Sequence, residues 1–285
     1  SLPDVETMTI HGRPVSMLHT YLYPGARILC LSEDASSPRE AASLLSSRGY
    51  GHSRITVLEN MGGSREQIYN GKANSWNFPE GSALNTLAIE CIEEAKPDLL
   101  SRIAGLPDSA FEHDGKLTKQ EVRSSVLAKL MPFPDHLLWD IGAGCVSVAI
   151  EWMRSHPNCH AIAVERSEDR LNMIRNNADA LGAPMLETIQ GEFPGIIHQL
   201  PRPDAVFLGG GISFESLERC WEALAPLGRL VSNAVTLESE RILLDWQASQ
   251  GGELTKFSIA RAESVGRFQG WRPLMPVTQL SMVKR

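Results

Sequence analysis

Short apolar runs alternate with amphipathic stretches along the second part of the chain. Apolar runs between turn signals predict buried strands, and apolar residues at helical spacing predict helices. The predicted strands are Leu137–Asp140, His160–Glu165, Met185–Ile189, Asp204–Leu208, Arg229–Val235, Leu254–Ala260 and Val277–Val283. The predicted helices run from a capping box at Thr118 and Glu121 to near Met131, from Gly144 to Trp152, and over Glu168–Leu181, Phe214–Leu224 and Leu237–Ala248. This alternation predicts an α/β fold with a mostly parallel, doubly wound sheet and a terminal antiparallel hairpin.

A smaller α/β unit precedes this pattern. Ala26–Leu31 and Arg54–Glu59 are predicted strands, and the helix Pro38–Ser47 between them has Pro in its first turn and Gly49 beyond its end. We expect a right-handed βαβ unit with parallel strands. The stretch Leu84–Ala95 is compatible with either a strand or a helix.

The boundary between the two parts follows from turn residues. Lys96–Asp98 starts a linker, and Gly105–Asp108 opens the next unit. The sequence therefore predicts two domains, residues 1–98 and 105–285. The chain starts at Ser1 without Met, inside apparent domain sequence, so we expect a fragment, a processed chain or a product of cloning.

Composition narrows the class of protein. The 285 residues are 42% hydrophobic, which is typical of a globular chain, and the net charge of -7 argues against a nucleic-acid partner. The five cysteines are scattered without Cys-x-x-Cys pairs, so no metal site or disulfide framework is predicted, and a reducing cytoplasm is expected. No apolar run approaches the length of a membrane span.

The most informative motif is an acid followed by two glycines. Asp140 ends the predicted strand, and Gly142, Ala143 and Gly144 form a tight turn into a helix. Glycines let the backbone turn sharply and approach a ligand, and the helix amino end favours polar or anionic groups. A dinucleotide site shares these features, but its third glycine is missing here, because residue 147 is Ser. The pattern resembles the first motif of class I methyltransferases that use S-adenosylmethionine.

Later strand ends supply further candidates for the site. Glu165 ends the second strand, where a carboxylate accepts both ribose hydroxyls of a nucleoside in either kind of cofactor. Glu192 follows the third strand, where an acid often reaches the adenine amino group, although a solvated loop acid explains it nearly as well. Cys145, just past the glycine turn, is expected to be a packing residue.

The acceptor side of the site is expected at the fourth and fifth strands. Gly209, Gly210 and Gly211 follow the fourth strand and leave room for a methyl acceptor, although a flexible turn is the alternative. Asn233 ends the fifth strand and either orients the substrate or caps a turn. Arg261 lies with Arg267 and Arg272 in a predicted loop, where guanidinium groups suit an anionic substrate and scattered surface arginines are the alternative.

The assembled segments resemble one family, the precorrin-6Y C(5,15)-methyltransferases (decarboxylating) of cobalamin biosynthesis. The stretches that carry the resemblance are Gly105–Asp108, Thr118–Arg123, Leu138–Gly144, Ser147–Glu151, Leu208–Gly211, Asn233–Glu238 and Trp271–Pro273. Val146 departs from the family, which usually has a third glycine there, and is expected to narrow the turn. In the first part, Pro3–Thr7, His11–Pro14, Pro38, Gly49–Gly51 and Leu58–Gly63 resemble the second lobe of a tetrapyrrole methylase domain, whose first lobe, with its cofactor loop, is absent.

The resemblance implies methylation of carbon 15 of a corrin precursor and loss of carbon dioxide from the acetate on carbon 12. It implies S-adenosylmethionine as cofactor, a tetrapyrrole substrate and a homo-oligomer, commonly a tetramer. The expected cofactor-binding residues are Thr118, Asp140, Gly142, Ala143, Gly144, Glu165, Glu192 and Gly209. The expected substrate-binding residues are Arg123, Gly211 and Arg261, with Asn233 and Gly210 at the reacting carbon. The alternatives are a non-catalytic cofactor-binding or assembly domain, or a class I methyltransferase acting on another small molecule or RNA.

Overall fold

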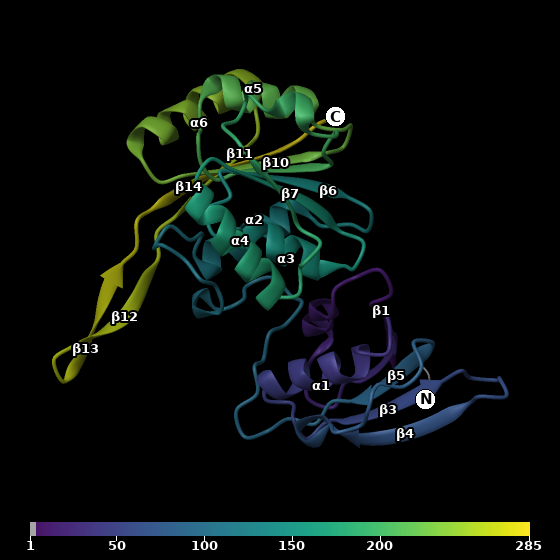
Figure 1. Cartoon of the computed structure of the whole chain (residues 1–285). Coiled ribbons are helices and arrows are strands. Elements are labelled where there is room, and N and C mark those ends of the chain that lie inside the picture. The colour runs from purple at the N-terminus through teal and green to yellow at the C-terminus, as the bar shows by residue number, and fades with distance from the viewer. Residues whose placement is uncertain (1–3) are drawn as a thin grey trace. The chain divides into compact units, whose positions relative to one another are not determined.

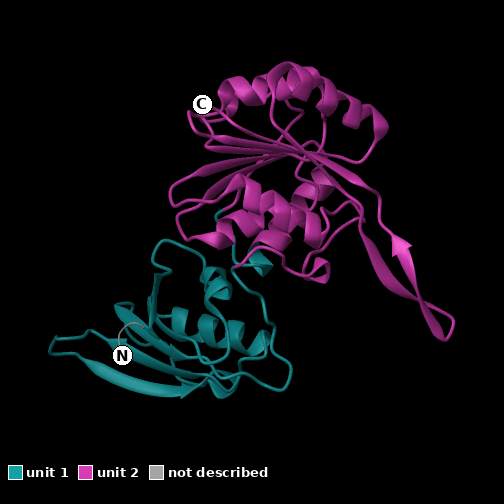
Figure 2. Cartoon of the chain, turned by 180° about the vertical axis from the view of Figure 1, so that it is seen from behind, with its two compact units in different colours: residues 1–102, 179–185 teal, residues 103–178, 186–285 magenta. Residues whose placement is uncertain are grey.

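The computed structural model describes residues 4–285, so the first residue of the Pro3–Thr7 match lies outside the described part. The chain divides into two compact units, drawn in different colours in Figure 2. Unit 1 comprises the residues up to Arg102 together with Asp179–Met185. Unit 2 comprises Ile103–Ala178 and Leu186–Arg285.

Unit 1 is built on a five-stranded sheet in the order β1-β2-β5-β3-β4. Its elements are β1 (Glu6–Thr9), β2 (Arg27–Leu31), α1 (Ser37–Ser47), β3 (Arg54–Glu59), β4 (Gln67–Lys72) and β5 (Asn85–Glu90), with 3-10 helices at Val15–Tyr21 and Ala73–Ser75. The predicted strands β2 and β3 and the helix α1 are confirmed. β2 and β3 run parallel to each other, because both pair antiparallel with β5, which lies between them. The stretch that was compatible with strand or helix is therefore the central strand of this sheet.

The sheet of unit 2 has seven strands in the order β11-β14-β10-β9-β6-β7-β8. They are β6 (Leu137–Ile141), β7 (His160–Glu165), β8 (Glu187–Gln190), β9 (Ala205–Leu208), β10 (Arg229–Ala234), β11 (Glu253–Phe257) and β14 (Val277–Val283). The first five are parallel, and β14 pairs antiparallel with both β10 and β11. The predicted doubly wound sheet with a terminal antiparallel pair is confirmed.

Helices cover both faces of this sheet (Figure 1). They are α2 (Gln120–Leu130), α3 (Ser147–Ser155), α4 (Glu168–Ala180), α5 (Phe214–Ala223) and α6 (Leu237–Gln250), and 3-10 helices lie at Asp108–Ala110 and Ile197–Gln199. Figure 1 shows α2, α3 and α4 on one face and α5 and α6 on the other. After β6 the chain builds β7 and β8 on one side, and it then returns to build β9 and β10 on the other. The carboxyl ends of β6 and β9 therefore mark the switch point where ligands bind in such sheets.

Two local predictions about unit 2 are wrong. The predicted capping box is not formed, because α2 begins after Lys119, whose side chain makes no capping hydrogen bond. The segment expected to be an arginine-bearing loop is a two-stranded hairpin, β12 (Ala260–Val265) and β13 (Phe268–Pro273). Its side chains are largely exposed on both strands, so it lacks the one-sided apolar pattern from which strands are predicted.

Candidate functional site

Two glycine loops meet at the switch point of the unit 2 sheet. A Cβ built on Gly142, after β6, would lie 2.8 Å from Gly210 Cα and 2.9 Å from Gly210 N, after β9. Gly142 also has φ +69°, which favours glycine. The two backbones thus approach more closely than any side chain at position 142 permits. The sequence predicted these glycines for the site, and the structure brings them into contact.

The turn after β6 is held from within by β7. Gly142 N and Ala143 N both donate to Val164 O, at 3.0 and 3.2 Å, and Gly144 N donates to Glu165 Oε2 at 3.1 Å. Gly142 is exposed and Ala143 half-buried, whereas Gly144 is buried. The accessible part of the turn is therefore its first two residues, and their N–H groups already bond to the protein.

Glu165 is buried at the end of β7 and connects three segments. Its carboxylate accepts hydrogen bonds from Gly144 N and from Ser167 N, each at 3.1 Å. Arg170 Nη1 lies 3.7 Å from Glu165 Oε2, and Arg170 also pairs with Asp114 at 2.8 Å. Arg170, which the sequence did not single out, thus links Glu165, the acid predicted to bind the nucleoside, to the segment that precedes α2.

Asp140 supports the turn from inside the sheet. It is 1% exposed, and its Oδ2 accepts a hydrogen bond at 3.1 Å from Ala149 N in the first turn of α3. Its Oδ1 has no hydrogen-bond partner among residues 4–285. Burial raises the pKa of the Asp140 carboxyl to about 7, opposed by the Ala149 N–H and assisted by the negative charge of Glu165.

We expect Asp140 to make the unfolding free energy depend on pH. Its pKa is about 7 when folded and about 3.9 when unfolded. The folded state therefore binds the extra proton between these values, so stability falls as pH rises from about 4 to 7 and then levels off. Asp140→Asn should flatten this part of the curve and raise stability at pH 8 by a few kcal/mol. Urea unfolding of both proteins across this pH range measures the difference. Parallel curves would contradict the prediction.

Val146 occupies an unusual backbone conformation at the start of α3. Its φ is +62° and ψ is +24°, a left-handed conformation that costs a β-branched residue about 1–2 kcal/mol. A glycine would adopt it without that cost. The side chain of Val146 is fully buried, while Gly142 and Ala143 remain accessible. The valine is accommodated in the interior of unit 2 rather than over the exposed part of the turn.

Residues 105–118, which we call the covering segment, run alongside the glycine turn. A Cβ built on Gly144 would lie 3.4 Å from Lys116 O. Asn177 of α4 holds the middle of the segment, because its Oδ1 accepts from Glu112 N and its Nδ2 donates to Glu112 O, both at 2.8 Å. Asn177 Nδ2 also lies 3.1 Å from Cys145 O. The covering segment and the turn are thus tied to the same helix.

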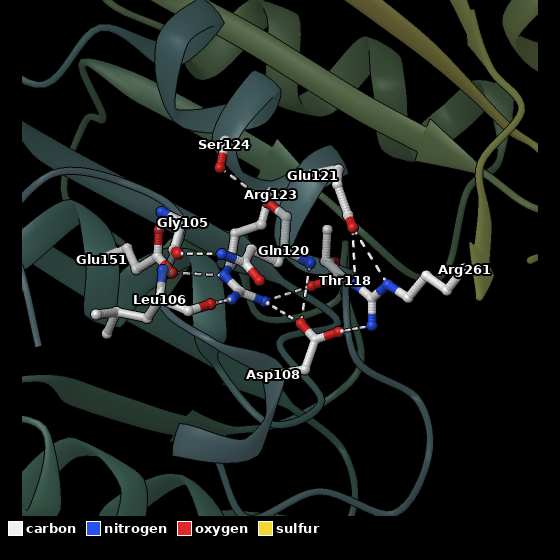
Figure 3. Close-up of polar contacts among 10 residues, drawn as sticks. All are labelled: Gly105, Leu106, Asp108, Thr118, Gln120, Glu121, Arg123, Ser124, Glu151 and Arg261. Atoms are coloured by element: carbon white, nitrogen blue, oxygen red, sulfur yellow. Dashed lines mark hydrogen bonds and ion pairs between the residues drawn. The ribbon is translucent and has the colours of Figure 1, made fainter. Parts of the chain in front are cut away.

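A buried ion pair fastens both ends of the covering segment (Figure 3). Arg123 Nε donates to Glu151 Oε1 at 2.6 Å, and the same guanidinium donates to Leu106 O and Thr118 O. Glu151 accepts in turn from Gly105 N at 2.7 Å and Leu106 N at 2.9 Å. Arg123 is fully buried and its donors are taken by the protein, which corrects the prediction that it binds substrate. Arg123 therefore has a structural role, because it connects both ends of the covering segment to Glu151 of α3.

Arg261 extends this network to the base of the β12–β13 hairpin. Its Nη1 donates to Asp108 Oδ2 at 2.8 Å and its Nη2 to Glu121 Oε2 at 2.7 Å, while Asp108 Oδ1 lies 3.3 Å from Arg123 (Figure 3). The hydrogen bond from Arg261 lowers the pKa of the Glu121 carboxyl. Arg261 remains partly exposed, and its Nε, Nη1 and Nη2 all donate to the carboxylates of Glu121 and Asp108.

The other predicted residues occupy different parts of this edge of the sheet. Thr118 is half-buried and uses its carbonyl to accept from Arg123. Glu192 is exposed and lies 4.0 Å from Arg166. Gly209 and Gly211 are exposed, and Gly211 has φ +68° with no atom within 4 Å of its built Cβ. Asn233 is 8% exposed near the end of β10, and its Oδ1 accepts from Gln279 Nε2 at 3.0 Å.

Comparison with known proteins defines the class of protein. A family model described as "Precorrin methyltransferase domain" matches residues 109–284. The crystal structure of the C-terminal domain of precorrin-6Y C5,15-methyltransferase from Rhodobacter capsulatus superimposes with a TM-score of 0.61 at 44% identity, covering 65% of this chain and all of that one. An S-adenosylmethionine-dependent O-methyltransferase from Thermotoga maritima, 14% identical with a TM-score of 0.52, covers 84% of this chain and 96% of its own, and shares the fold. Unit 2 has the fold of a class I, Rossmann-like methyltransferase.

The relatives narrow this class to one family. The precorrin-6Y C(5,15)-methyltransferase [decarboxylating] of Sinorhizobium sp is 44% identical over 285 residues, which cover the whole of this chain and 69% of the relative. A Pyrobaculum calidifontis protein named "Probable cobalt-precorrin-6B C(15)-methyltransferase (decarboxylating)" is 31% identical over 61% of this chain and 92% of its own length. The chain belongs to the precorrin-6Y C(5,15)-methyltransferase (decarboxylating) family.

Within residues 4–285, each helix is too short or too polar to cross a bilayer.

Proposed function

We propose that this chain methylates carbon 15 of a precorrin-type substrate with S-adenosylmethionine and removes carbon dioxide from the acetate on carbon 12. The observation that carries the proposal is the contact of Gly142 with Gly210 at the switch point, in a chain that belongs to this family over its whole length. This contact supports a site in which the predicted cofactor turn faces the predicted acceptor loop.

The residues around the turn fit the cofactor. Gly142 and Ala143 offer an accessible backbone surface without bulky side chains, and Glu165 lies directly behind Gly144. We propose Gly142, Ala143, Gly144, Glu165, Glu192, Gly209 and Thr118 as the cofactor site, with Asp140 supporting it through α3. When bound, the cofactor supplies an electrophilic methyl group. The protein contributes position, because a methyl group is transferred only when the attacking carbon is held in line with it.

The acceptor side combines open loops with polar groups from neighbouring elements. Gly211 is exposed and its built Cβ meets no atom within 4 Å, whereas a Cβ on Gly209 would lie 2.8 Å from the Phe207 ring. Gly210 fixes the loop against the cofactor turn. Asn233 and the partly exposed Arg261 would bind substrate carboxylates. Loss of carbon dioxide would leave its bonding electrons in the conjugated macrocycle, and the methylene carbon that remains would then take up a proton from solvent to become a methyl group. The protein would hold the acetate away from water while the carbon–carbon bond breaks. A homo-oligomer, commonly a tetramer in the family, is part of the proposal, and the exposed Phe268 and Trp271 of the hairpin support it.

Unit 1 is proposed to be the second lobe of a tetrapyrrole methylase domain, with a structural role in this chain. The limits proposed for the two domains remain residues 1–98 and 105–285. We expect one cofactor molecule per chain, because the acid-glycine turn occurs in unit 2 alone among the described residues. Titration calorimetry with S-adenosylmethionine measures the stoichiometry. Two molecules bound per chain would contradict this assignment.

The proposed reaction is tested with the whole chain, a precorrin-6B-type substrate and cofactor carrying a labelled methyl group. We expect a product that has gained one labelled methyl and lost one carbon dioxide by mass. Methyl gain without carbon dioxide loss would contradict the decarboxylating half, and an unchanged substrate would contradict the proposal. Binding of cofactor without turnover would favour the non-catalytic alternative.

Glu165→Ala should weaken S-adenosylmethionine binding by about 1–3 kcal/mol, since it removes the acceptor proposed for the ribose and leaves Gly144 N unpaired. Calorimetry measures the dissociation constant. Glu168→Ala removes an exposed acid three residues along and serves as the control. Equal affinities of the two variants would remove Glu165 from the proposed site.

A further inference from the structure

Three polar side chains from three elements form a hydrogen-bonded chain beside the acceptor loop. Ser125 Oγ of α2 donates to Gln279 Oε1 of β14 at 3.1 Å, and Gln279 Nε2 donates to Asn233 Oδ1 of β10 at 3.0 Å. Gln279 and Asn233 are directly opposed in the antiparallel β10–β14 pair. Gln279 is 1% exposed and Asn233 is 8% exposed. We call these residues the amide relay.

In the amide relay, the nitrogen end of the Asn233 amide is the end left without a partner. The oxygen of Asn233 is occupied by Gln279, and the oxygen of Gln279 is occupied by the Ser125 hydroxyl. The amide nitrogen Nδ2 of Asn233 is buried and has no hydrogen-bond partner within residues 4–285. Buried polar atoms in folded proteins are nearly always paired, so an unpaired donor in a fully occupied relay points to a ligand.

The position of Asn233 connects this donor with the acceptor loop. Ser232 pairs with Leu208, the last residue of β9, and its hydroxyl donates to Leu208 O at 3.0 Å. Asn233 therefore lies one residue further along, at the level of Gly209, which directly follows the neighbouring strand β9. An N–H donor at this level complements an oxygen acceptor on the substrate, and a precorrin carries such oxygens in its acetate and propionate carboxylates.

We propose that Gln279 is a positioning residue for this reaction. Held by Ser125, it orients the Asn233 amide so that its NH₂ group, and not its oxygen, binds a carboxylate oxygen of the corrin precursor. This inference rests on the proposed function for the identity of the substrate. It assigns a role to β14, an antiparallel strand that contributes no residue to the predicted site.

The test reverses the polarity of the relay without changing its shape. In Gln279→Glu the new carboxylate still accepts from Ser125, but it cannot donate to Asn233 Oδ1, so it accepts from Asn233 Nδ2 and turns the amide oxygen toward the substrate. Gln279→Leu removes both hydrogen bonds and leaves the amide free to turn either way. Asn233→Asp keeps the acceptor for Gln279 and replaces the proposed donor directly. Gln250→Glu, at an exposed position of α6, is the matched control for the added charge.

We expect Gln279→Glu and Asn233→Asp to raise KM for a precorrin-6B-type substrate by about 10- to 100-fold, the effect of replacing a hydrogen bond with an unpaired, repelling oxygen. Gln279→Leu should raise it less. The dissociation constant for S-adenosylmethionine should change less than about twofold in all three, and Gln250→Glu should match the parent. The assay is run near pH 7 and pH 9, because the carboxyl group introduced by Gln279→Glu still donates when it is protonated, and the defect of this variant should be larger at the higher pH.

Several outcomes would overturn the inference. A purely structural role predicts that Gln279→Leu, which loses both bonds, is the more impaired variant. Normal kinetics of Gln279→Glu at pH 9, with normal thermal unfolding, would show that the donor face of Asn233 is not needed. Where the Gln279 variants unfold, Asn233→Asp decides, and a parent-like KM in that variant overturns the inference. A parent protein without methyl transfer contradicts the proposed function, whereas an active parent with unaffected variants contradicts the relay alone.

Discussion

Arg123→Ala should lower the free energy of unfolding by about 3–5 kcal/mol, the usual effect of removing one partner of a buried ion pair. The change leaves the Glu151 carboxylate, 1% exposed, without its cation. It also removes the donors to Leu106 O and Thr118 O, which hold the two ends of the covering segment. We therefore expect faster proteolysis and amide exchange in residues 105–118, together with weaker cofactor binding. Urea unfolding and hydrogen exchange measure the two effects.

The control for this experiment is Arg219→Ala. Arg219 pairs with Glu222 at 3.1 Å, but both side chains are at least half exposed, so its loss should change stability little. Arg123→Lys keeps the charge without the planar fork that reaches several acceptors at once, and its stability should lie between that of the parent and Arg123→Ala. Equal stability of Arg123→Ala and Arg219→Ala would show that the buried pair does not fasten the covering segment.

The strand–helix alternation of unit 2 was predictable because its central strands β6, β7, β9 and β10 are buried. Runs such as His160–Glu165 and Asp204–Leu208 are continuous and apolar up to their polar ends, as expected for parallel strands covered by helices. The edge strands of unit 1 gave no such signal. β4 is polar and mostly exposed, and β1 has four residues, so neither carries enough apolar periodicity to be recognised.

The site was predictable where the backbone itself is functional and less so where side chains pair across the fold. The glycines at 142 and 210 were found because glycine marks unusual backbone geometry. Arg123 was assigned to the substrate as a cation that could pair a carboxylate, although its spacing to Leu127 and Leu130 follows the buried face of α2. That i, i+4, i+7 spacing was the available signal for its burial.

The β12–β13 hairpin and the amide relay show two other limits. The turn of the hairpin lies at Gly266 and Arg267, and Gly266 has φ +58°. A glycine at this place is typical of a tight hairpin turn. It was the available signal for the hairpin, because the flanking strands are polar and exposed. Gln279 is a polar residue in the buried part of β14, but its partners lie 46 and 154 residues away in sequence. Pairings at such separations depend on the assembled sheet, so they follow from the structure alone.

Gly142→Ala is the substitution we expect to affect the site most. It forces a left-handed conformation on alanine and places a Cβ 2.8 Å from Gly210 Cα. The atoms that this Cβ meets are backbone atoms of Gly210, so no flexible side chain can move aside. Strain and overpacking together should cost about 2–5 kcal/mol. Because the two loops must separate to make room, we expect loss of measurable S-adenosylmethionine binding as well as a lower melting temperature.

The matched control for Gly142→Ala is Gly211→Ala, which isolates the contact from the backbone strain. Gly211 has nearly the same φ, +68° against +69°, but its built Cβ has no atom within 4 Å. Gly211→Ala should therefore lose only the roughly 1–2 kcal/mol of left-handed strain and keep its cofactor affinity. Thermal unfolding and calorimetry on both variants separate the two terms. If Gly211→Ala lost stability and affinity to the same extent as Gly142→Ala, strain alone would explain the effect, and the contact between the two loops would have no part in building the site.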